Sequence, residues 1–388
     1  MALCACDGLY NPSFFTIYYD SSDSINTILD DENINTIIHE YIHFIQDICT
    51  TYGLANMSNV FSGIAHFYND EKKNITLPFD FETPQFFFET NQKLFFYYFG
   101  GNCYEKFLKY SDVKIKQYEQ TPKKEELDTE DLKGLRYHVI KLSCNKYGSL
   151  YEKKYCFGAQ AIMECMSNIF EKHLGETFAN TYYRIPYDLP ELVIKHIYPQ
   201  MAQKDSYIFA LCDAAMLYFN PGDIFIKALK KMKAEKFIPQ SLEQIYEFVS
   251  RFYPGPIMNL FLKTKNEALK NAKNIVNVRE YRFAYHWVRN TVDHFYRKRK
   301  SDIAFLAHIL DFDSVTSRIM FLHLIKDEIS PLIFNKNNEV CFLGNSPVDT
   351  QDSSKLFFWF YISKINKYIF NSSSRDCPYM EICTDFNN

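Results

Sequence analysis

The chain has 388 residues, of which 47% are hydrophobic and 17% aromatic, and its formal net charge is −4. This length allows one large domain or two modest ones, with ample material for a buried core. A charge so close to zero gives the chain no overall attraction to nucleic acid or to a membrane surface, so it excludes functions that depend on bulk electrostatic binding.

The first predicted element is a strand over residues 13–19. This segment is rich in aromatic and β-branched residues, and the turn-forming run Asp20–Ser24 follows it directly. We therefore expect a strand immediately before the next element, which carries the most informative motif of the chain.

That next element is a predicted helix between Asn33 and Gly53. Asn33 or Asn35 is a candidate N-cap, and Gly53 stands where a glycine commonly ends a helix. Apolar residues recur at helical spacing in two stripes, which predicts burial of most of the circumference. A buried helix keeps polar side chains on one face only where something satisfies them. The polar residues that share a face here are His39, His43, Gln46 and Thr50.

Residues 39–43 of this helix follow the pattern H-E-x-x-H. Imidazoles four residues apart lie one turn from each other on one helix face, so His39 and His43 can bind a single metal ion. The carboxylate of Glu40 projects beside that ion and can take a proton from a metal-bound water. The alternative is two core histidines that bond to their neighbours, with Glu40 at the surface. The caps and the single polar face favour the metal site.

On His39, Glu40 and His43, and on the strand before them, the chain resembles the zincin superfamily of metallopeptidases. The resemblance covers about the first half of the chain and implies a Zn²⁺ cofactor, with Glu40 as general base for a metal-activated water that attacks a peptide bond. Metzincins extend the motif to H-E-x-x-H-x-x-G-x-x-H, whereas Gln46 and Cys49 occupy those later positions here. The resemblance is therefore to gluzincin-like enzymes, in which a second helix supplies a glutamate ligand.

Glu164 is the candidate for this third ligand. It lies among apolar positions of a predicted helix over residues 157–170, where an unpaired carboxylate would be costly. Asn168, one turn later, is a candidate to hold the carboxylate. Gln46 and Asp47 are candidates to orient His43 or neighbouring backbone. The competing third ligands are His66, Glu71 and Glu89.

Strands and a loop flank the Glu164 helix. Residues 112–118 alternate and predict a strand, and residues 137–142 and 149–156 predict a hairpin around Asn145–Gly148. In zincins an edge strand lies antiparallel to the bound peptide, and this hairpin is one candidate for that role.

In the loop after the helix, Tyr182, Tyr183 and Arg184 are candidates to stabilise the oxyanion of a tetrahedral intermediate. A packed aromatic loop is the alternative.

From Ala202 onward the sequence predicts mostly helix, with one hairpin-like interruption at residues 335–338. The predicted helix over residues 279–300 is basic and ends in Arg297–Lys300, with aromatic residues interleaved. Such a helix could meet nucleic acid or an acidic protein. A cationic last turn also suits the helix dipole, and a solvated helix end is the favoured interpretation.

The predicted fold is a predominantly helical α+β fold. Residues 1–220 would form a zincin-like catalytic domain with a small sheet and the H-E-x-x-H helix, and residues 221–388 a mostly α-helical C-terminal region. The predicted function is that of a zinc metallopeptidase with a narrow intracellular protein target. The alternatives are a non-catalytic regulatory or binding protein that retains the zincin fold, and a nucleic-acid-associated effector that uses the basic helix.

Localisation follows from three further features. The apolar runs are too short to span a bilayer. The first residues lack basic side chains and reach Asp7 early, which predicts no secretory leader. The eleven cysteines show no regular framework and predict free thiols in a reducing compartment. We therefore expect a cytoplasmic protein that binds a protein or peptide substrate, without a membrane span and without nucleic acid.

Overall fold

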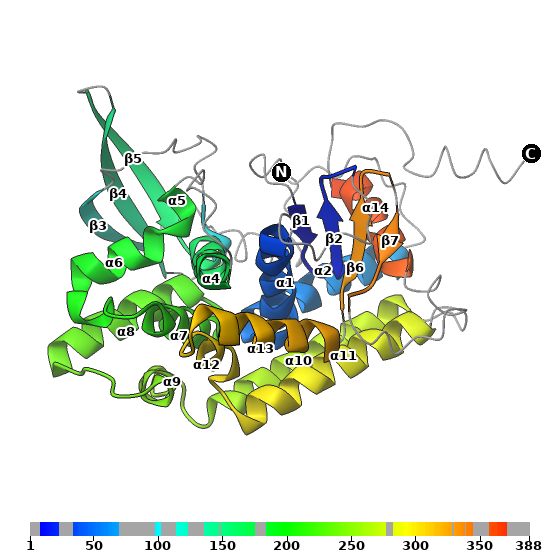
Figure 1. The fold of residues 1–388 in the computed structure, drawn as a ribbon. Helices are drawn as coiled ribbons and strands as arrows, with labels where there is room; N and C mark the ends of the chain where they lie inside the picture. Colours follow the sequence, from blue (N-terminus) through cyan, green and yellow to red (C-terminus); the bar gives the residue numbers. More distant parts are fainter. Residues whose placement is uncertain are drawn as a thin grey trace, which may run out of the picture.

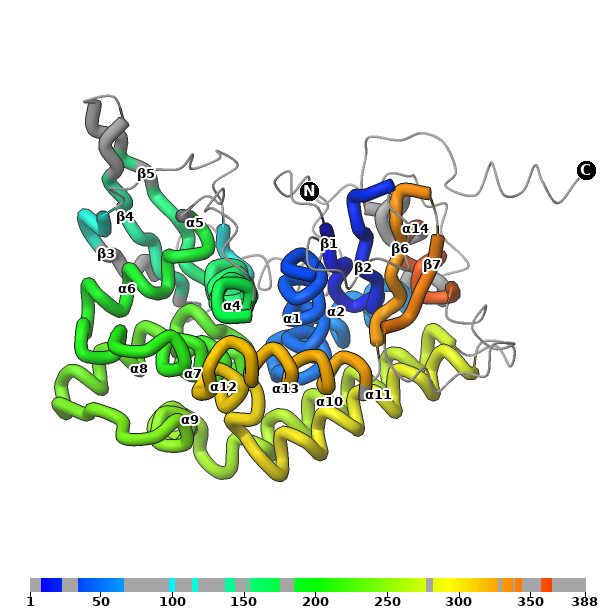
Figure 2. The backbone as a smooth tube through the Cα atoms, in the orientation of Figure 1, coloured from blue at the N-terminus to red at the C-terminus, as the bar shows by residue number. Residues whose placement is uncertain are grey.

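The computed structural model contains many helices and two small sheets, so the fold is the predominantly helical α+β fold that the sequence predicts (Figure 1; Figure 2). None of the helices in the described part of the chain is long and apolar enough to cross a membrane. The structure describes residues 8–22, 34–69, 98–101, 114–122, 136–146, 149–174, 184–276, 282–327, 330–337, 339–343 and 357–370.

The elements follow in chain order. The strands are β1 (Gly8–Asn11), β2 (Thr16–Tyr19), β3 (Lys114–Pro122), β4 (Arg136–Lys146), β5 (Ser149–Phe157), β6 (Leu332–Asn335) and β7 (Val340–Cys341). The helices before residue 220 are α1 (Ile34–Cys49), α2 (Thr51–Asn69), α4 (Ala159–Leu174), α5 (Arg184–Tyr187), α6 (Leu189–Ile197), the 3-10 helix η3 (Pro199–Met201) and α7 (Asp205–Met216). The later helices are α8 (Pro221–Glu235), α9 (Leu242–Ser250), α10 (Ile257–Ile275), α11 (Arg282–Ser301), α12 (Phe305–Ile309), α13 (Ser314–Asp327) and α14 (Phe357–Phe370).

The first sheet has the order β1-β2-β6-β7 and lies beside α1 (Figure 1). The predicted N-terminal strand is confirmed over Thr16–Tyr19 as β2. Strand β1, which pairs antiparallel with it, was not predicted. Ser13 and Phe15 have φ values of 68° and 56°, so the left-handed backbone between the two strands is a turn rather than extended chain. β2 also pairs with β6 in parallel, and β6 pairs with β7 in the predicted late hairpin.

The second sheet is antiparallel and has the order β3-β4-β5. The predicted strand at residues 112–118 is confirmed over its described residues, 114–118, as part of β3, and the predicted hairpin is confirmed as β4 and β5. β5 ends at Phe157, two residues before α4 begins, so this sheet leads directly into the Glu164 helix.

Helix α1 contains the H-E-x-x-H motif, as predicted, but two details of its ends differ. It begins at Ile34, so Asn35 lies inside the helix and is not its N-cap; Asn33 lies outside the described residues. The prediction that Gly53 ends this helix is wrong, because α1 ends at Cys49 and Gly53 lies within α2. The break is made by Thr50, whose hydroxyl donates to the carbonyl oxygen of Gln46 (2.6 Å) and accepts from the amide of Gly53 (3.0 Å).

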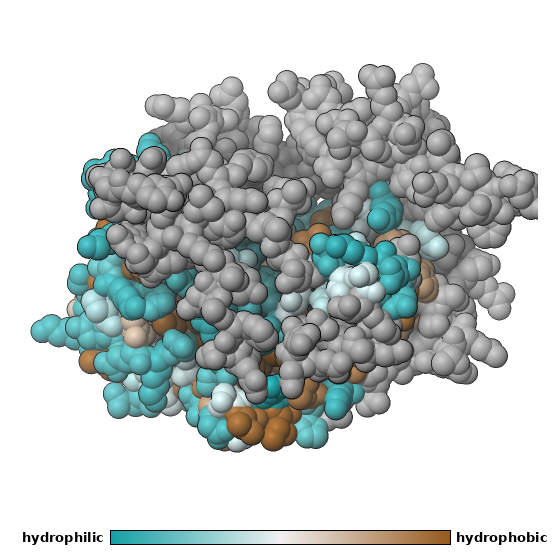
Figure 3. Space-filling model, turned by 45° about the horizontal axis from the view of Figure 1, so that its top comes forward, coloured by the Kyte–Doolittle hydropathy of each residue, from teal (hydrophilic) through white to brown (hydrophobic). Residues whose placement is uncertain are grey.

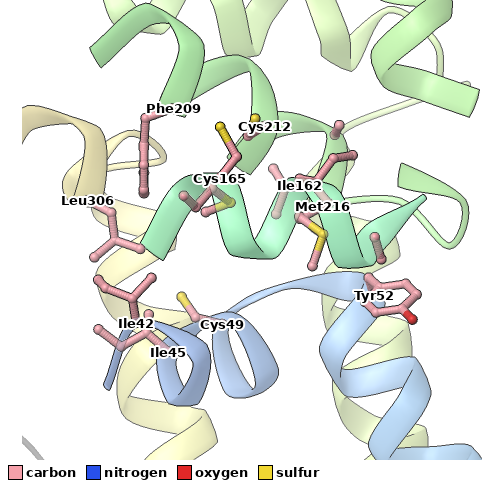
Figure 4. Packing of buried hydrophobic residues seen from close by; sticks show 14 of the residues in the cluster. Ile42, Ile45, Cys49, Tyr52, Ile162, Cys165, Phe209, Cys212, Met216 and Leu306 are labelled. Carbon is pink, nitrogen blue, oxygen red and sulfur yellow. The ribbon is translucent and has the colours of Figure 1, made fainter. Parts of the chain in front are cut away.

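A single cluster of buried apolar residues extends from the first sheet to α14 and includes residues on both sides of position 220. β2 and β6 likewise come from opposite sides of the boundary that the sequence predicts there, and that boundary stays a prediction. Helix α4 lies between α1 and α7 in this core (Figure 4). The labelled side chains that pack there come from α1 (Ile42, Ile45, Cys49), α4 (Ile162, Cys165) and α7 (Phe209, Cys212, Met216).

A buried ion pair crosses this core beneath α1. The guanidinium of Arg299 on α11 donates to both carboxylate oxygens of Asp213 on α7, at 2.8 and 2.9 Å. It also donates to the sulfur of Cys49 at the end of α1 (3.3 Å), and the hydroxyl of Tyr246 on α9 donates to Asp213 (2.6 Å). The burial raises the pKa of the Cys49 thiol, although the nearby Arg299 opposes the shift. These contacts fix the C-terminal end of α1 to three other helices.

The same ion pair changes the interpretation of the basic helix. Within the run Arg297–Lys300, which the sequence predicts as a solvated helix end, Arg299 is only 1% exposed and belongs to the core. In the preceding turns Asp293 pairs with Arg289 (3.6 Å) and with Lys265 of α10.

One face of the molecule is mostly hydrophilic over its described surface, with an apolar patch at its lower edge (Figure 3).

Candidate metal centre

Helices α1 and α4 pack against each other and bring three predicted ligands together. His39 and His43 project from the same face of α1, one turn apart, and Glu164 projects toward them from α4. We call these three residues the donor triad. Within the described part of the chain, no other group of three His, Cys, Asp or Glu side chains converges in this way.

The donor atoms of the triad have the mutual spacing of ligands around one small ion. Nε2 of His39 lies 3.2 Å from Nε2 of His43 and 3.3 Å from Oε2 of Glu164. Nε2 of His43 lies 3.7 Å from the same carboxylate oxygen. Ligands that bind a tetrahedral zinc ion at about 2.0–2.1 Å lie about 3.3 Å from one another. The three atoms therefore fit a single zinc ion.

Hydrogen bonds at the opposite ring nitrogens decide which nitrogen atoms carry lone pairs. The amide nitrogen of Gln46 donates to the carbonyl oxygen of Met163 (3.0 Å), so its Oε1 faces Nδ1 of His43 (2.8 Å) and accepts from it. Nδ1 of His39 lies 3.2 Å from a carboxylate oxygen of Glu171, which also accepts. In the neutral rings both Nε2 atoms then carry lone pairs and face the Glu164 carboxylate. Three electron-rich atoms at this distance repel each other unless a proton or a metal cation lies among them.

Electrostatics of the triad point to the same need for positive charge. Burial lowers the pKa of His39, but hydrogen bonds to Glu164 and Glu171 and the charge of Glu40 raise it overall from 6.5 to about 10. Burial raises the pKa of Glu164, but its bonds from His39 and His43 outweigh that effect and hold the pKa well below its usual range. A divalent cation satisfies this demand, and two imidazole nitrogens with one carboxylate oxygen are ordinary donors for zinc.

Glu40, the predicted general base, is buried beside the triad. One of its carboxylate oxygens accepts a hydrogen bond of 2.6 Å from the backbone amide of Tyr10 on β1. The strand can approach this closely because position 8 is a glycine. An ideal Cβ at Gly8 would lie 2.6 Å from Cγ2 of Thr36 and 3.0 Å from Cγ of Glu40.

The other predicted positioning residues have different surroundings. Gln46 contacts His43, as described above, whereas Asp47 bonds to neighbouring backbone: its Oδ2 accepts from the amide of Ser13 at 2.6 Å. Asn168 is buried on α4, and its role in holding Glu164 stays a prediction. Ser167, which the sequence did not suggest, lies with its hydroxyl 3.4 Å from Nδ1 of His43.

The predicted oxyanion stabilisers are outside the described residues, as are two of the competing ligands. These are Tyr182, Tyr183 and the side chain of Arg184 among the stabilisers, and Glu71 and Glu89 among the ligands; the side chain of His66, the third competitor, also lies outside the described part. Tyr187, the last residue of the short helix α5, does reach the triad. Its ring lies edge-on to that of His39, with 5.9 Å between the ring centroids.

Sequence reasoning missed Glu171, Ser167 and Tyr10. Glu171 had a usable signal, because it lies seven residues after Glu164 and therefore two turns along the same face of α4. Tyr10 had no such signal, since its contact with Glu40 depends on how β1 packs on α1.

Comparisons with protein-family models, with curated proteins and with solved structures gave no match.

Proposed function

We propose that the protein is a zinc-dependent hydrolase that cleaves a peptide bond, with the donor triad as its metal ligands. The observation that carries this proposal is the convergence of three donor atoms at 3.2, 3.3 and 3.7 Å from one another. Glu171 and Gln46 support it, because each holds the far nitrogen of one imidazole and so directs Nε2 toward the common point.

Zn²⁺, when bound, makes water more acidic and polarises a carbonyl group. Glu40 adjoins the triad, and its carboxylate would accept a proton from the attacking water as the hydroxide oxygen bonds to the carbonyl carbon. Glu40 would then return that proton to the leaving nitrogen as the C–N bond breaks. The burial of Glu40, 5% exposed, keeps bulk water from competing for this proton.

The choice of a peptide bond rests on the resemblance of His39, Glu40 and His43 to zincin metallopeptidases. The edge strand β1 lies directly on α1 beside Glu40, whereas the sequence suggested the β4–β5 hairpin for the strand that meets a peptide.

Elemental analysis of the full chain tests the metal site first. We expect about one zinc per chain, lost in His39→Ala and in Glu164→Ala but kept in Glu40→Gln and in Glu191→Gln. Glu191 is a suitable control because it lies on α6 and pairs with Lys195. Zinc retained in Glu164→Ala would reopen the search for the third ligand, and a wild-type chain without zinc under conditions that preserve it would refute the proposal.

Peptidase activity is tested separately with a proteome-derived peptide library as substrate and mass spectrometry as readout. The zinc-loaded wild type should cleave a subset of peptides, Glu191→Gln should cleave the same subset, and Glu40→Gln should leave them intact. One zinc per chain without any cleavage would favour the non-catalytic binding protein instead.

A further inference from the structure

Tyr10 donates hydrogen bonds to two carboxylates of helix α1. Its backbone amide donates to Oε2 of Glu40 (2.6 Å), and its phenol hydroxyl donates to Oδ2 of Asp47 (2.8 Å). Glu40 and Asp47 are seven residues apart, so they lie two turns from each other on the same face of α1. A single residue of β1 therefore spans the length of α1 between the proposed general base and Asp47.

Asp47 receives a second hydrogen bond from the turn that follows β1. The amide of Ser13 donates to the same Oδ2 at 2.6 Å, from a residue whose φ of 68° is left-handed. Such a backbone conformation persists only where its surroundings hold it. The side chain of Asn56 on α2 also reaches this turn and donates to the hydroxyl of Ser13 (3.3 Å). Asp47 is thus the acceptor that fixes both the strand and its turn on α1.

β1 is the edge strand of its sheet, so pairing with β2 secures only one of its sides. On the other side the strand depends on α1 for its hydrogen bonds, and the amide of Tyr10 finds its acceptor in Glu40. A glutamate side chain has three rotatable bonds, and an ordered donor on one carboxylate oxygen restricts all of them. The second oxygen of Glu40 is then held in one place.

We propose that Asp47 is a positioning residue for Glu40 and acts through Tyr10: the Asp47–phenol bond fixes β1, and the amide of Tyr10 in turn orients the carboxylate of Glu40. This inference rests on the proposed function in one respect, namely that Glu40 is the base. The arrangement itself consists of hydrogen bonds among Tyr10, Ser13, Glu40 and Asp47, and none of them involves the donor triad.

The experiment is amide hydrogen exchange, resolved to Tyr10, on the full chain and its variants. Tyr10→Phe removes the phenol hydroxyl but keeps the ring and the backbone amide. Asp47→Ala removes the acceptor, and Asp47→Asn is the conservative variant that retains an acceptor oxygen. Tyr18→Phe is the matched control, because Tyr18 lies on β2 and is 42% exposed. Glu40→Ala tests the acceptor of the amide directly.

We expect exchange at the amide of residue 10 to become about tenfold faster, or more, in Tyr10→Phe, Asp47→Ala and Glu40→Ala. The double variant Tyr10→Phe/Asp47→Ala should be no faster than the faster single variant, since both single variants remove the same Tyr10–Asp47 hydrogen bond. Asp47→Asn should recover most of the protection, and Tyr18→Phe should match the wild type. Exchange within α4 should stay at the wild-type rate in every variant.

Unchanged exchange at residue 10 in Tyr10→Phe and Asp47→Ala would overturn the proposal, and so would an equal acceleration in α4, which would mean a general loss of stability. The exchange measurement needs neither zinc nor substrate, so it decides this proposal even if the chain proves not to be a peptidase.

On a peptide that the wild type cleaves, Tyr10→Phe should lower kcat about tenfold with KM and zinc content unchanged. A rise in KM alone would contradict a role in positioning the base.

Discussion

Glu171 lies with a carboxylate oxygen 3.2 Å from Nδ1 of His39, while Glu164 of the same helix lies 3.3 Å from Nε2 of that ring. Helix α4 thus holds His39 from both sides. A carboxylate that accepts from the far nitrogen of a ligating imidazole fixes the ring and makes its other nitrogen more basic. The role of Glu171 can be measured independently of any substrate.

We predict that Glu171→Gln weakens zinc binding about 10- to 100-fold without abolishing it, because the amide oxygen still accepts from Nδ1 but carries no charge. Competition with a zinc chelator of known affinity gives the dissociation constant. Glu235→Gln is the control, since Glu235 lies on α8 and pairs with Arg251 rather than with a histidine of the triad. Equal affinities for Glu171→Gln and wild type would mean that the contact does not influence the metal site.

The buried pair of Arg299 and Asp213 predicts a large loss of stability when one partner is removed. Arg299→Met leaves the Asp213 carboxylate without its cation in the core and should lower the free energy of unfolding by about 3–5 kcal/mol. The double variant Arg299→Met/Asp213→Leu should lose less than the two single changes added together. Chemical denaturation measures all three. Arg297→Met, at the exposed neighbouring position, should stay within about 0.5 kcal/mol of wild type.

Gly53 predicts a second stability effect, at the junction of α1 and α2. An ideal Cβ there would lie 2.3 Å from the carbonyl oxygen of Asp47 and 2.5 Å from that of Gln46. Gly53→Ala must push the two helices apart and should cost about 1–3 kcal/mol, although alanine favours helix more than glycine does. Thermal or chemical unfolding tests this against Ser62→Ala on the exposed face of α2. A stabilised Gly53→Ala would contradict the close approach.

Asp47 predicts a defined dependence of stability on pH. Burial raises its pKa from 3.8 to about 7, although the bonds from Ser13 and Tyr10 oppose the shift. The folded state therefore binds more protons than the unfolded state between about pH 4 and 7, and this contribution to stability falls as pH rises through that window. The slope is at most about 1.4 kcal/mol per pH unit. Tyr10 and Tyr52 face Asp47, and burial raises the pKa of both above 10, so they stay neutral in that range.

The measurement is the free energy of unfolding of wild type and Asp47→Asn at several pH values. The variant lacks the titrating group, so its stability relative to wild type should increase from pH 4 to pH 7 and then level off. The triad and its carboxylates are common to both proteins and cancel in the difference. Parallel curves over the whole range would show that Asp47 titrates at the same pH in the folded and unfolded states.

Much of the donor triad could be predicted because it depends on local rules. Helical spacing alone places His39 and His43 together, and the cost of a carboxylate among apolar positions singled out Glu164. Gln46 followed from its place on the polar face of α1. Each of these inferences needed only the helix period and the types of the neighbouring residues.

What could not be predicted depends on contacts between distant segments. Nothing near Tyr10 in the sequence reveals that its amide faces Glu40, and a run of four cations gives no sign that Arg299 alone turns into the core. Gly53 has the position of a helix-ending glycine, and only the packing of α2 against α1 shows that it serves a close approach instead. Periodicity in the sequence predicts one helix or strand at a time, whereas the role of each of these residues depends on the contact between two elements.

The parallel pairing of β2 with β6 has a consequence for the order in which the protein is made. Helices α1 and α4 are both complete once residue 174 has been synthesised, but β2 meets its second partner only when residues 332–335 emerge. β1, whose Tyr10 amide donates to Glu40, depends on β2 for its own pairing. Contacts of such long sequence separation form late and slowly. Helices α1 and α4 would therefore emerge from the ribosome well before β2 gains its second partner, and the final position of β1 against Glu40 would be reached only when synthesis is nearly complete.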